Sequence, residues 1–247
     1  MLIIIDKRIP EEAKQTLAGY GELLEFATHG ITYDAISGHP DIFFCQTPGG
    51  LIVAPNAPAE FLLQLESRYI PYTPGEKPVG SKYPETARYN AVVTDKYLIH
   101  NTSVTDPSIL NSTLTFIPSH SFLRPSPYSI LRSPYSIRQA YTRCNLIALG
   151  EDHFITSDRG IEKALISNNL EVLYVSPKGI MLPGFPNGFF GGCCGVWEDK
   201  LFITGSLNHY SEGDKVRQFS RRAGFRVIEL YDGPLFDGGG ILFINYQ

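Results

Sequence analysis

One pattern recurs along this chain: an apolar strand, a turn, a second apolar strand and then the start of a helix. The first strands begin about 45 to 55 residues apart, a period that marks propellers and related arrays. They cover residues 41–44, 90–93, 145–148 and 194–197. This period favours a closed ring of similar units, with a generic open α/β sheet as the alternative.

The remaining parts of each unit follow in the same order. The second strands are short and rich in β-branched or aromatic residues, at 51–54, 97–100, 153–156 and 201–204. Helices are predicted at 59–65, 107–110, 160–166 and 213–223. Each follows residues whose side-chain oxygens can cap a helix: Asn56, Asp106, Ser157-Asp158 and Ser206. Third strands are predicted at 114–117, 170–175 and 225–230, with a weaker one near 69–70. Each unit is therefore read as ββαβ.

The two ends of the chain complement each other. Residues 239–244 supply a first strand with no continuation, and residues 2–6 supply a second strand with no first strand. Segment 2–17 also resembles segment 51–65, since both run from an apolar strand through a proline into a helix. We therefore predict one domain, residues 1–247, with the α/β fold of a five-bladed pseudo-symmetric ββαβ propeller. Its fifth unit is closed by the N- and C-termini, which leaves few sheet edges exposed.

Composition limits the partners of such a protein. A net charge of -4 gives no electrostatic reason to bind nucleic acid or an anionic membrane. The apolar run that opens the chain is too short for a signal peptide or a membrane span. We expect a cytoplasmic protein with a small-molecule substrate and no nucleic-acid or membrane partner, of undetermined oligomeric state. The four cysteines lack metal-site spacing, so no metal or cofactor is expected.

Two segments leave alternatives open. The adjacent Cys193 and Cys194 are expected as free thiols rather than as a strained disulfide, because the expected compartment is reducing. Residues 118–139 are rich in serine, proline and tyrosine and repeat the sequence SPYSI, which indicates a long loop. A lid and a plain surface excursion are both consistent with this loop.

Candidate site residues gather at the starts of the first strands. In a closed ring these strands lie nearest the axis, so their starts converge on one end of a central channel. Thiols, an imidazole, carboxylates and amides together can form a thiolate nucleophile with an acid/base partner. The converging residues are His39, Asp41, Asn90, Arg143, Cys144, Asn145, Cys193, Cys194 and Asp237. The alternative roles are structural, with Cys144 a small buried apolar residue and His39 a turn residue.

Two short motifs resemble a known superfamily. Residues 39–44 (HPDIFF) and 236–243 (FDGGGILF), with a cysteine two units after the histidine, are similar to the guanidino-group modifying enzymes, or penteins. This superfamily includes arginine deiminases, dimethylarginine hydrolases, amidinotransferases and non-catalytic ribosome-binding relatives. The resemblance implies a five-unit ring with His39 as general acid/base and Cys144 as nucleophile. It also implies that Asp41 and Asp237 contact a substrate guanidinium.

The order of the motifs and two of their residues depart from the superfamily pattern. The acidic-Gly-Gly unit comes last in the chain, which implies a circular permutation. Residues 191–197 (GGCCGVW) lack an acid that the family usually carries, and Asp237-Gly-Gly is followed by Gly240 instead of an acid. Cys193 and Cys194 are flanked by glycines that let the backbone approach closely, so both are alternatives to Cys144 as nucleophile, Cys194 before Cys193. Cys193, Asn90 and Asn145 are further candidate substrate contacts.

These observations predict a cysteine-dependent hydrolase or transferase. It would act on C–N bonds of a small nitrogen-rich substrate, guanidino- or amidino-like, through a covalent thio-intermediate. The alternative is a non-catalytic protein of pentein fold that binds a macromolecular partner, which the missing acids favour.

Overall fold

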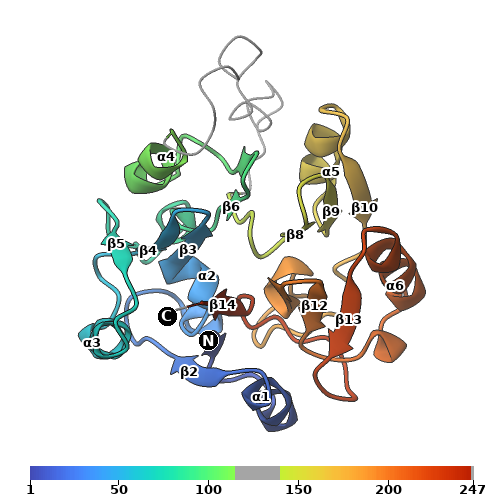
Figure 1. Ribbon diagram of the computed structural model, residues 1–247, viewed down its shortest axis with the longest axis horizontal. Helices are drawn as coiled ribbons and strands as arrows, with labels where there is room; N and C mark the ends of the chain where they lie inside the picture. Colours follow the sequence, from blue (N-terminus) through green and yellow to red (C-terminus); the bar gives the residue numbers. More distant parts are fainter. Residues whose placement is uncertain (115–139, 246–247) are drawn as a thin grey trace.

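The computed structural model describes residues 1–114 and 140–245, whose strands form five separate sheets (Figure 1). The first strand of each sheet is β3 (Phe44–Thr47), β6 (Val92–Val93), β8 (Leu146–Leu149), β11 (Cys194–Trp197) or β14 (Leu242–Ile244). The antiparallel partners of these strands are β4 (Gly50–Val53), β7 (Leu98–Ile99), β9 (His153–Thr156), β12 (Lys200–Ile203) and β1 (Leu2–Asp6). Four sheets add a parallel third strand: β5 (Tyr72–Pro74), β10 (Glu171–Tyr174), β13 (Arg226–Glu229) and β2 (Glu22–Phe26).

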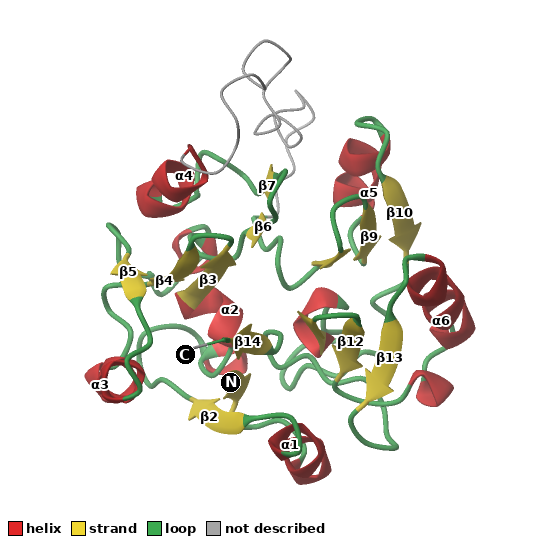
Figure 2. Ribbon diagram, in the orientation of Figure 1, coloured by secondary structure: helices red, strands yellow, loops and turns green. Residues whose placement is uncertain are grey.

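A helix follows the second strand of every sheet. Parallel neighbours need a crossover, which is supplied by α1 (Glu11–Ala18), α3 (Ala59–Ser67), α5 (Arg159–Ile166) and α6 (Gly213–Arg222). Helix α4 (Pro107–Leu114) follows β7. Figure 2 shows these helices on the outer side of the sheets. The ββαβ order is therefore complete in four units within the described residues.

The two ends of the chain pair in one sheet, as predicted. Strand β1 pairs antiparallel with β14, with Leu2 opposite Ile244 and Ile4 opposite Leu242. It also pairs in parallel with β2, so it is the central strand of its sheet. All five of its residues are buried, which explains why its sequence is a continuous apolar run ending in Asp6. The labels of the two termini lie close together in Figure 1.

The five first strands follow one another around a common centre (Figure 1). Strand β3 lies beside β6, β6 beside β8, β8 beside β11, and β11 beside β14. The amide Nε2 of Gln46 in β3 donates to the carbonyl of Phe243 in β14 at 2.8 Å, which connects the last strand to the first. The described strands pair only within their own sheets, so they do not form a hydrogen-bonded barrel.

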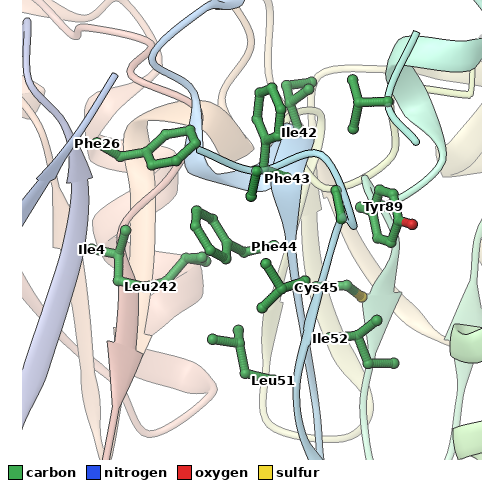
Figure 3. Close-up of a cluster of buried hydrophobic side chains, with 14 of the residues drawn as sticks. Ile4, Phe26, Ile42, Phe43, Phe44, Cys45, Leu51, Ile52, Tyr89 and Leu242 are labelled. Atoms are coloured by element: carbon green, nitrogen blue, oxygen red, sulfur yellow. The ribbon is translucent and has the colours of Figure 1, made fainter. Parts of the chain in front are cut away.

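Aromatic packing joins the sheet of the two termini to its neighbour. Figure 3 shows Phe26 of β2 above Ile4 and Leu242, facing Phe43 and Phe44. The ring of Phe26 lies 5.2 Å from that of Phe43 and 4.9 Å from that of Phe44, centroid to centroid. Burial of one such side chain contributes about 1.5 to 3 kcal/mol. These rings hold in place the segment that carries His39.

Three details differ from the prediction. The strand expected at 41–44 begins only at Phe44, because Pro40 starts the helical turn α2 (Pro40–Phe43), where its fixed φ and missing N–H fit the first helical position. Asn56 caps no helix, since both polar atoms of its amide bond the backbone of Val79. Leu114 ends α4, and the remainder of the strand expected at 114–117 and the loop expected at 118–139 lie outside the described residues.

No helix in the described parts of the chain is long and apolar enough to cross a membrane.

Candidate active site

A cavity of about 140 Å³ lies where the segments leading into several first strands meet. Three of the predicted site residues line it together: His39, Cys144 and Asp237. The remaining lining residues are mostly apolar or aromatic: Tyr33, Ile36, Ile42, Tyr141, Leu182, Phe185, Asn187 and Phe189. A thiol, an imidazole and a carboxylate from three distant parts of the chain therefore share one small, largely apolar cavity.

His39 lies between two carboxylates. It precedes the first turn of α2 and is 2% exposed. Its Nδ1 lies 4.0 Å from Oδ1 of Asp237, and its Nε2 lies 4.0 Å from Oδ2 of Asp6. Burial lowers the pKa of His39, and the two carboxylates oppose that shift. The buried Nε2 atom has no hydrogen-bond partner among the described residues.

Asp237 is fixed by two backbone N–H groups. Its Oδ2 accepts from Phe189 at 2.8 Å and its Oδ1 accepts from Gly239 at 3.1 Å. A Cβ at Gly192 would overlap Oδ1, so the close approach of this backbone requires glycine. Burial raises the pKa of Asp237, against the opposing effects of His39 and the two N–H groups. Each carboxylate oxygen keeps acceptor capacity for a further donor.

Cys144 lies in the turn before β8 and is 5% exposed. Its backbone N–H donates to Oδ1 of Asn90 at 3.2 Å. Burial raises the pKa of the Cys144 thiol well above its usual value, and the charges of Asp41 and Asp237 raise it further while Arg143 opposes them. The resting side chain is therefore a thiol, and a cation beside it is needed to favour the thiolate.

Asp41 does not line the cavity, contrary to the expectation of a direct substrate contact. It is fully buried, and neither carboxylate oxygen has a hydrogen-bond partner among the described residues. Burial raises the pKa of Asp41 to about 8, with Arg143 opposing the shift and Asp237 adding to it. Asp41 is therefore mainly protonated at neutral pH.

A second cavity of about 130 Å³ lies among the five first strands. Arg143 lines this second cavity, whereas its neighbour Cys144 lines the first. The guanidinium of Arg143 donates to the carbonyls of Gly191 at 2.7 Å and Cys194 at 2.9 Å. Adjacent residues of one turn thus belong to two different cavities.

The other two candidate thiols are placed elsewhere. Cys193 ends the short 3-10 helix η5 (Gly191–Cys193), and Cys194 begins β11. Both are free, fully buried and absent from the lining of either cavity. The Cys193 thiol donates to the carbonyl of Phe189 at 3.4 Å, and burial raises the pKa of both thiols. The structure therefore does not bring Cys193 or Cys194 together with His39 around the cavity.

The two predicted amides do not line the cavity but bind neighbouring segments, and Nδ2 of Asn145 also lies 3.9 Å from Sγ of Cys144. Nδ2 of Asn90 donates to the carbonyl of Asp41 at 3.1 Å, while its Oδ1 accepts from Cys144. Nδ2 of Asn145 donates to the carbonyl of Tyr141 at 2.8 Å, and its Oδ1 accepts from the Ser157 hydroxyl at 3.0 Å. Both side chains therefore hold the segments that carry site residues.

Sequence reasoning missed Asp6 and the aromatic wall of the cavity. Asp6 ends β1 and accepts from Nε and Nη2 of Arg8 at 2.9 and 2.6 Å. Its signal was available, since a carboxylate ends an otherwise apolar buried strand. Tyr33 and Tyr141 join their hydroxyls at 3.1 Å. These tyrosines lie in loops, where no periodic pattern marks them.

Replacing Gly239 with alanine is expected to destabilise the protein by about 3 kcal/mol or more. Gly239 has φ +68°, and an added Cβ would overlap Cβ of His39. Gly30 is the matched control, because it has φ +70° and open space around it, so its alanine variant is expected to lose only about 1 to 2 kcal/mol. Urea unfolding of both variants measures the difference. Equal losses would show that no close contact with His39 requires glycine at 239.

Comparison with known proteins gives a family and a fold. Residues 4–242 match a family described as of unknown function (DUF6873). No curated protein matches the chain. Among solved structures, the chain resembles a Cys-to-Ser mutant of DDAH from Pseudomonas aeruginosa complexed with citrulline. The two chains are 11% identical with a TM-score of 0.50, and the match covers 92% of this chain and 91% of the DDAH chain. It also resembles SxtG, an amidinotransferase from Microseira wollei in the saxitoxin biosynthetic pathway, with 9% identity and a TM-score of 0.48 over 92% and 87%. The likeness to DDAH shows a mixed α/β fold of the pentein kind.

Proposed function

The chain belongs to the DUF6873 family, whose function is unknown, and from its site we propose a cysteine-dependent enzyme that breaks a C–N bond of a small guanidinium or amidinium compound. The observation that carries the proposal is the shared cavity of His39, Cys144 and Asp237. A nucleophile, an acid/base group and a carboxylate are the parts that such a reaction needs. The citrulline in the DDAH complex is a ureido compound, which is the product class expected from hydrolysis of a guanidinium.

In the first half of the proposed reaction, His39 takes the thiol proton and Cys144 attacks the central carbon of the cation. A C–S bond forms, the C–N bond to the leaving amine breaks, and His39 returns the proton to that amine. In the second half, a water molecule replaces the amine. His39 takes a proton from this water, the new C–O bond forms, and the C–S bond breaks. The thiolate regains its proton from His39. The product leaves as a protonated ureido compound or amide and loses this extra proton to the released amine.

The substrate's own charge would activate the nucleophile. Burial keeps the Cys144 pKa high in the resting protein, but a guanidinium or amidinium in the cavity would favour the thiolate and the ionised form of Asp237. Asp237 would hold the cation through a charge-assisted hydrogen bond. Asp41, outside the lining, would act on the cation through its charge after losing its proton. Such a site would keep its thiol unreactive until a cation enters.

We also propose how the five sheets are arranged and how the order of the units arose. We infer that residues 1–247 form one domain, a five-bladed ββαβ propeller whose unit order is circularly permuted relative to other penteins. The pairing of β1 with β14 supports this, because a ring whose ends pair in one sheet can be opened at another connection at little cost. The placement of the acidic-Gly-Gly motif in the last unit agrees with such an opening.

A second candidate function is the binding of a macromolecular partner without catalysis. The high pKa of the buried Cys144 thiol favours it, because a protonated thiol is a poor nucleophile. In that case the cavity residues would have structural roles, and no cation would change the reactivity of Cys144.

A screen for turnover tests the proposal. The full chain is incubated with guanidines and amidines at several pH values between about 6 and 9, and released amine and ureido or amide product are measured by mass spectrometry. We expect product from at least one cation, together with a transient adduct on a single cysteine. Folded protein that releases no amine from any of these compounds would exclude this activity and leave the binding function.

A further inference from the structure

Resting on the function proposed above, we infer that the substrate is a guanidine or amidine with a short apolar or aromatic substituent, and not an amino acid that carries a carboxylate. The cavity offers one place for a cation and one for an apolar group. Among the described residues that line it, none would hold an anion.

The charged groups around the cavity disfavour a carboxylate on the substrate. Within the described residues, the lining contains no lysine or arginine, and Asp237 is its one carboxylate. A substrate carboxylate would lose its hydration here without gaining a cationic partner, and it would meet the charge of Asp237. Two arginines near the site are engaged elsewhere. Arg143 lines the other cavity, and Arg8 binds Asp6 with two nitrogens.

Aromatic residues at the mouth of the cavity favour an apolar or aromatic substituent. Two side chains that line the cavity are large, aromatic and partly exposed to solvent: Tyr33 is 36% and Phe185 is 49% exposed. Their ring centroids lie 5.9 Å apart with the planes inclined by 47°. Exposed aromatic residues at the edge of a pocket gain by covering an apolar group, and an aromatic group packed against them adds a favourable ring contact.

A chain of hydrogen-bonded hydroxyl groups fixes the position of Tyr33. Its hydroxyl bonds that of Tyr141 at 3.1 Å, and the Tyr141 hydroxyl bonds that of Thr86 at 2.5 Å. A chain of hydroxyls holds one aromatic wall, so that little side-chain entropy is lost when a ligand packs against it. Phe185 packs against Tyr33 and adds a second, more exposed aromatic surface.

The volume of the cavity limits the length of the substituent. The cavity measures about 140 Å³, and an apolar protein cavity of about 150 Å³ accepts benzene. The cavity therefore holds about one planar group of that size, so a guanidinium beside His39 and Asp237 fills much of it, and a substituent of about one ring extends onto the partly exposed side chains of Tyr33 and Phe185. A long polar chain would extend past the mouth.

Calorimetric titration of the full-length Cys144→Ser protein tests the inference without turnover. The ligands are benzylguanidine, methylguanidine, guanidinoacetate and the uncharged benzyl alcohol. Benzylguanidine is expected to bind about tenfold more tightly than methylguanidine, and guanidinoacetate more weakly than either. Adding Phe185→Ala is expected to weaken benzylguanidine about tenfold and to leave methylguanidine unchanged. Tyr69→Ala is the matched control, since Tyr69 is an aromatic residue 89% exposed and outside the cavity lining.

The outcomes separate this inference from the function on which it rests. Guanidinoacetate binding as tightly as benzylguanidine, or Phe185→Ala without effect, overturns the substrate class and leaves the proposed function standing. Absence of binding by all three cations, or equal binding of benzyl alcohol and benzylguanidine, overturns the cation site and both proposals with it. A loss in Tyr33→Ala that matches the loss in Phe185→Ala supports the aromatic mouth by a second variant.

Discussion

Replacing Cys144 with serine is expected to lower turnover of a guanidinium or amidinium substrate by at least about 1000-fold. The serine hydroxyl is a far weaker nucleophile than a thiol, and no base in the cavity is positioned for it beyond His39. The measurement is the steady-state rate of amine release with the substrate found in the screen. Circular dichroism and urea unfolding of the same variant show that the loss is not a loss of fold.

Cys45 provides the matched control for this substitution. Its thiol is also free and buried, but it lies in β3 and lines neither cavity. Cys45→Ser is therefore expected to keep turnover within about threefold while losing stability comparable to that of Cys144→Ser. Full activity in Cys144→Ser with a large loss in Cys193→Ser or Cys194→Ser would move the nucleophile to η5 or β11.

Replacing Asp41 with asparagine is expected to remove a large part of the pH dependence of stability. The folded protein holds the Asp41 proton up to about pH 8, whereas the unfolded chain releases it near 3.8. Between these values the native state binds one proton more than the unfolded state, so the free energy of unfolding falls as pH rises. The full shift corresponds to roughly 6 kcal/mol. Asp41→Asn should make the slope of unfolding free energy against pH less negative by up to about 1.4 kcal/mol per pH unit.

Urea unfolding at intervals between pH 5 and 8 measures this slope. Asp95 lies exposed in the turn between β6 and β7, and Asp95→Asn is expected to keep the wild-type slope. Parallel curves for wild type and Asp41→Asn would mean that Asp41 ionises as readily in the folded protein as in the unfolded chain. A cation ligand should also lower the pKa of Asp41, so its binding near pH 7 is expected to release protons.

The elements built from continuous apolar runs could be predicted from the sequence. Residues 2–6 form a buried central strand and residues 242–244 pair with it, because β-branched runs bounded by turns leave little choice of structure. The cap of α5 was also predictable, as Asp158 accepts from the N–H groups of Gly160 and Ile161. His39, Cys144 and Asp237 were predicted together from their places at strand starts, and they line one cavity.

The residues that the sequence placed wrongly depend on a local helical turn or on tertiary contacts. Pro40 turns the chain into a helix before β3, which changes the direction of the segment that carries Asp41. The helical turn η5 buries Cys193, and no local pattern distinguishes it from Cys144 as a nucleophile. Tyr33 and Phe185 meet across a gap of about 150 residues of chain, in loops whose course is set by contacts such as that between Asp237 and Phe189.

The central claim is that Cys144 is a nucleophile in a cavity that binds a cation, and competing alkylation tests it most directly. The protein is treated with chloroacetamidine, an amidinium, and with its neutral counterpart chloroacetamide, and labelled cysteines are mapped by mass spectrometry. Each rate is divided by the rate with a small-molecule thiol. Cys144 is predicted to react at least about tenfold faster with the amidinium, and Asp237→Asn to abolish this preference. Equal normalised rates at Cys144, or faster labelling of another cysteine, would contradict the account.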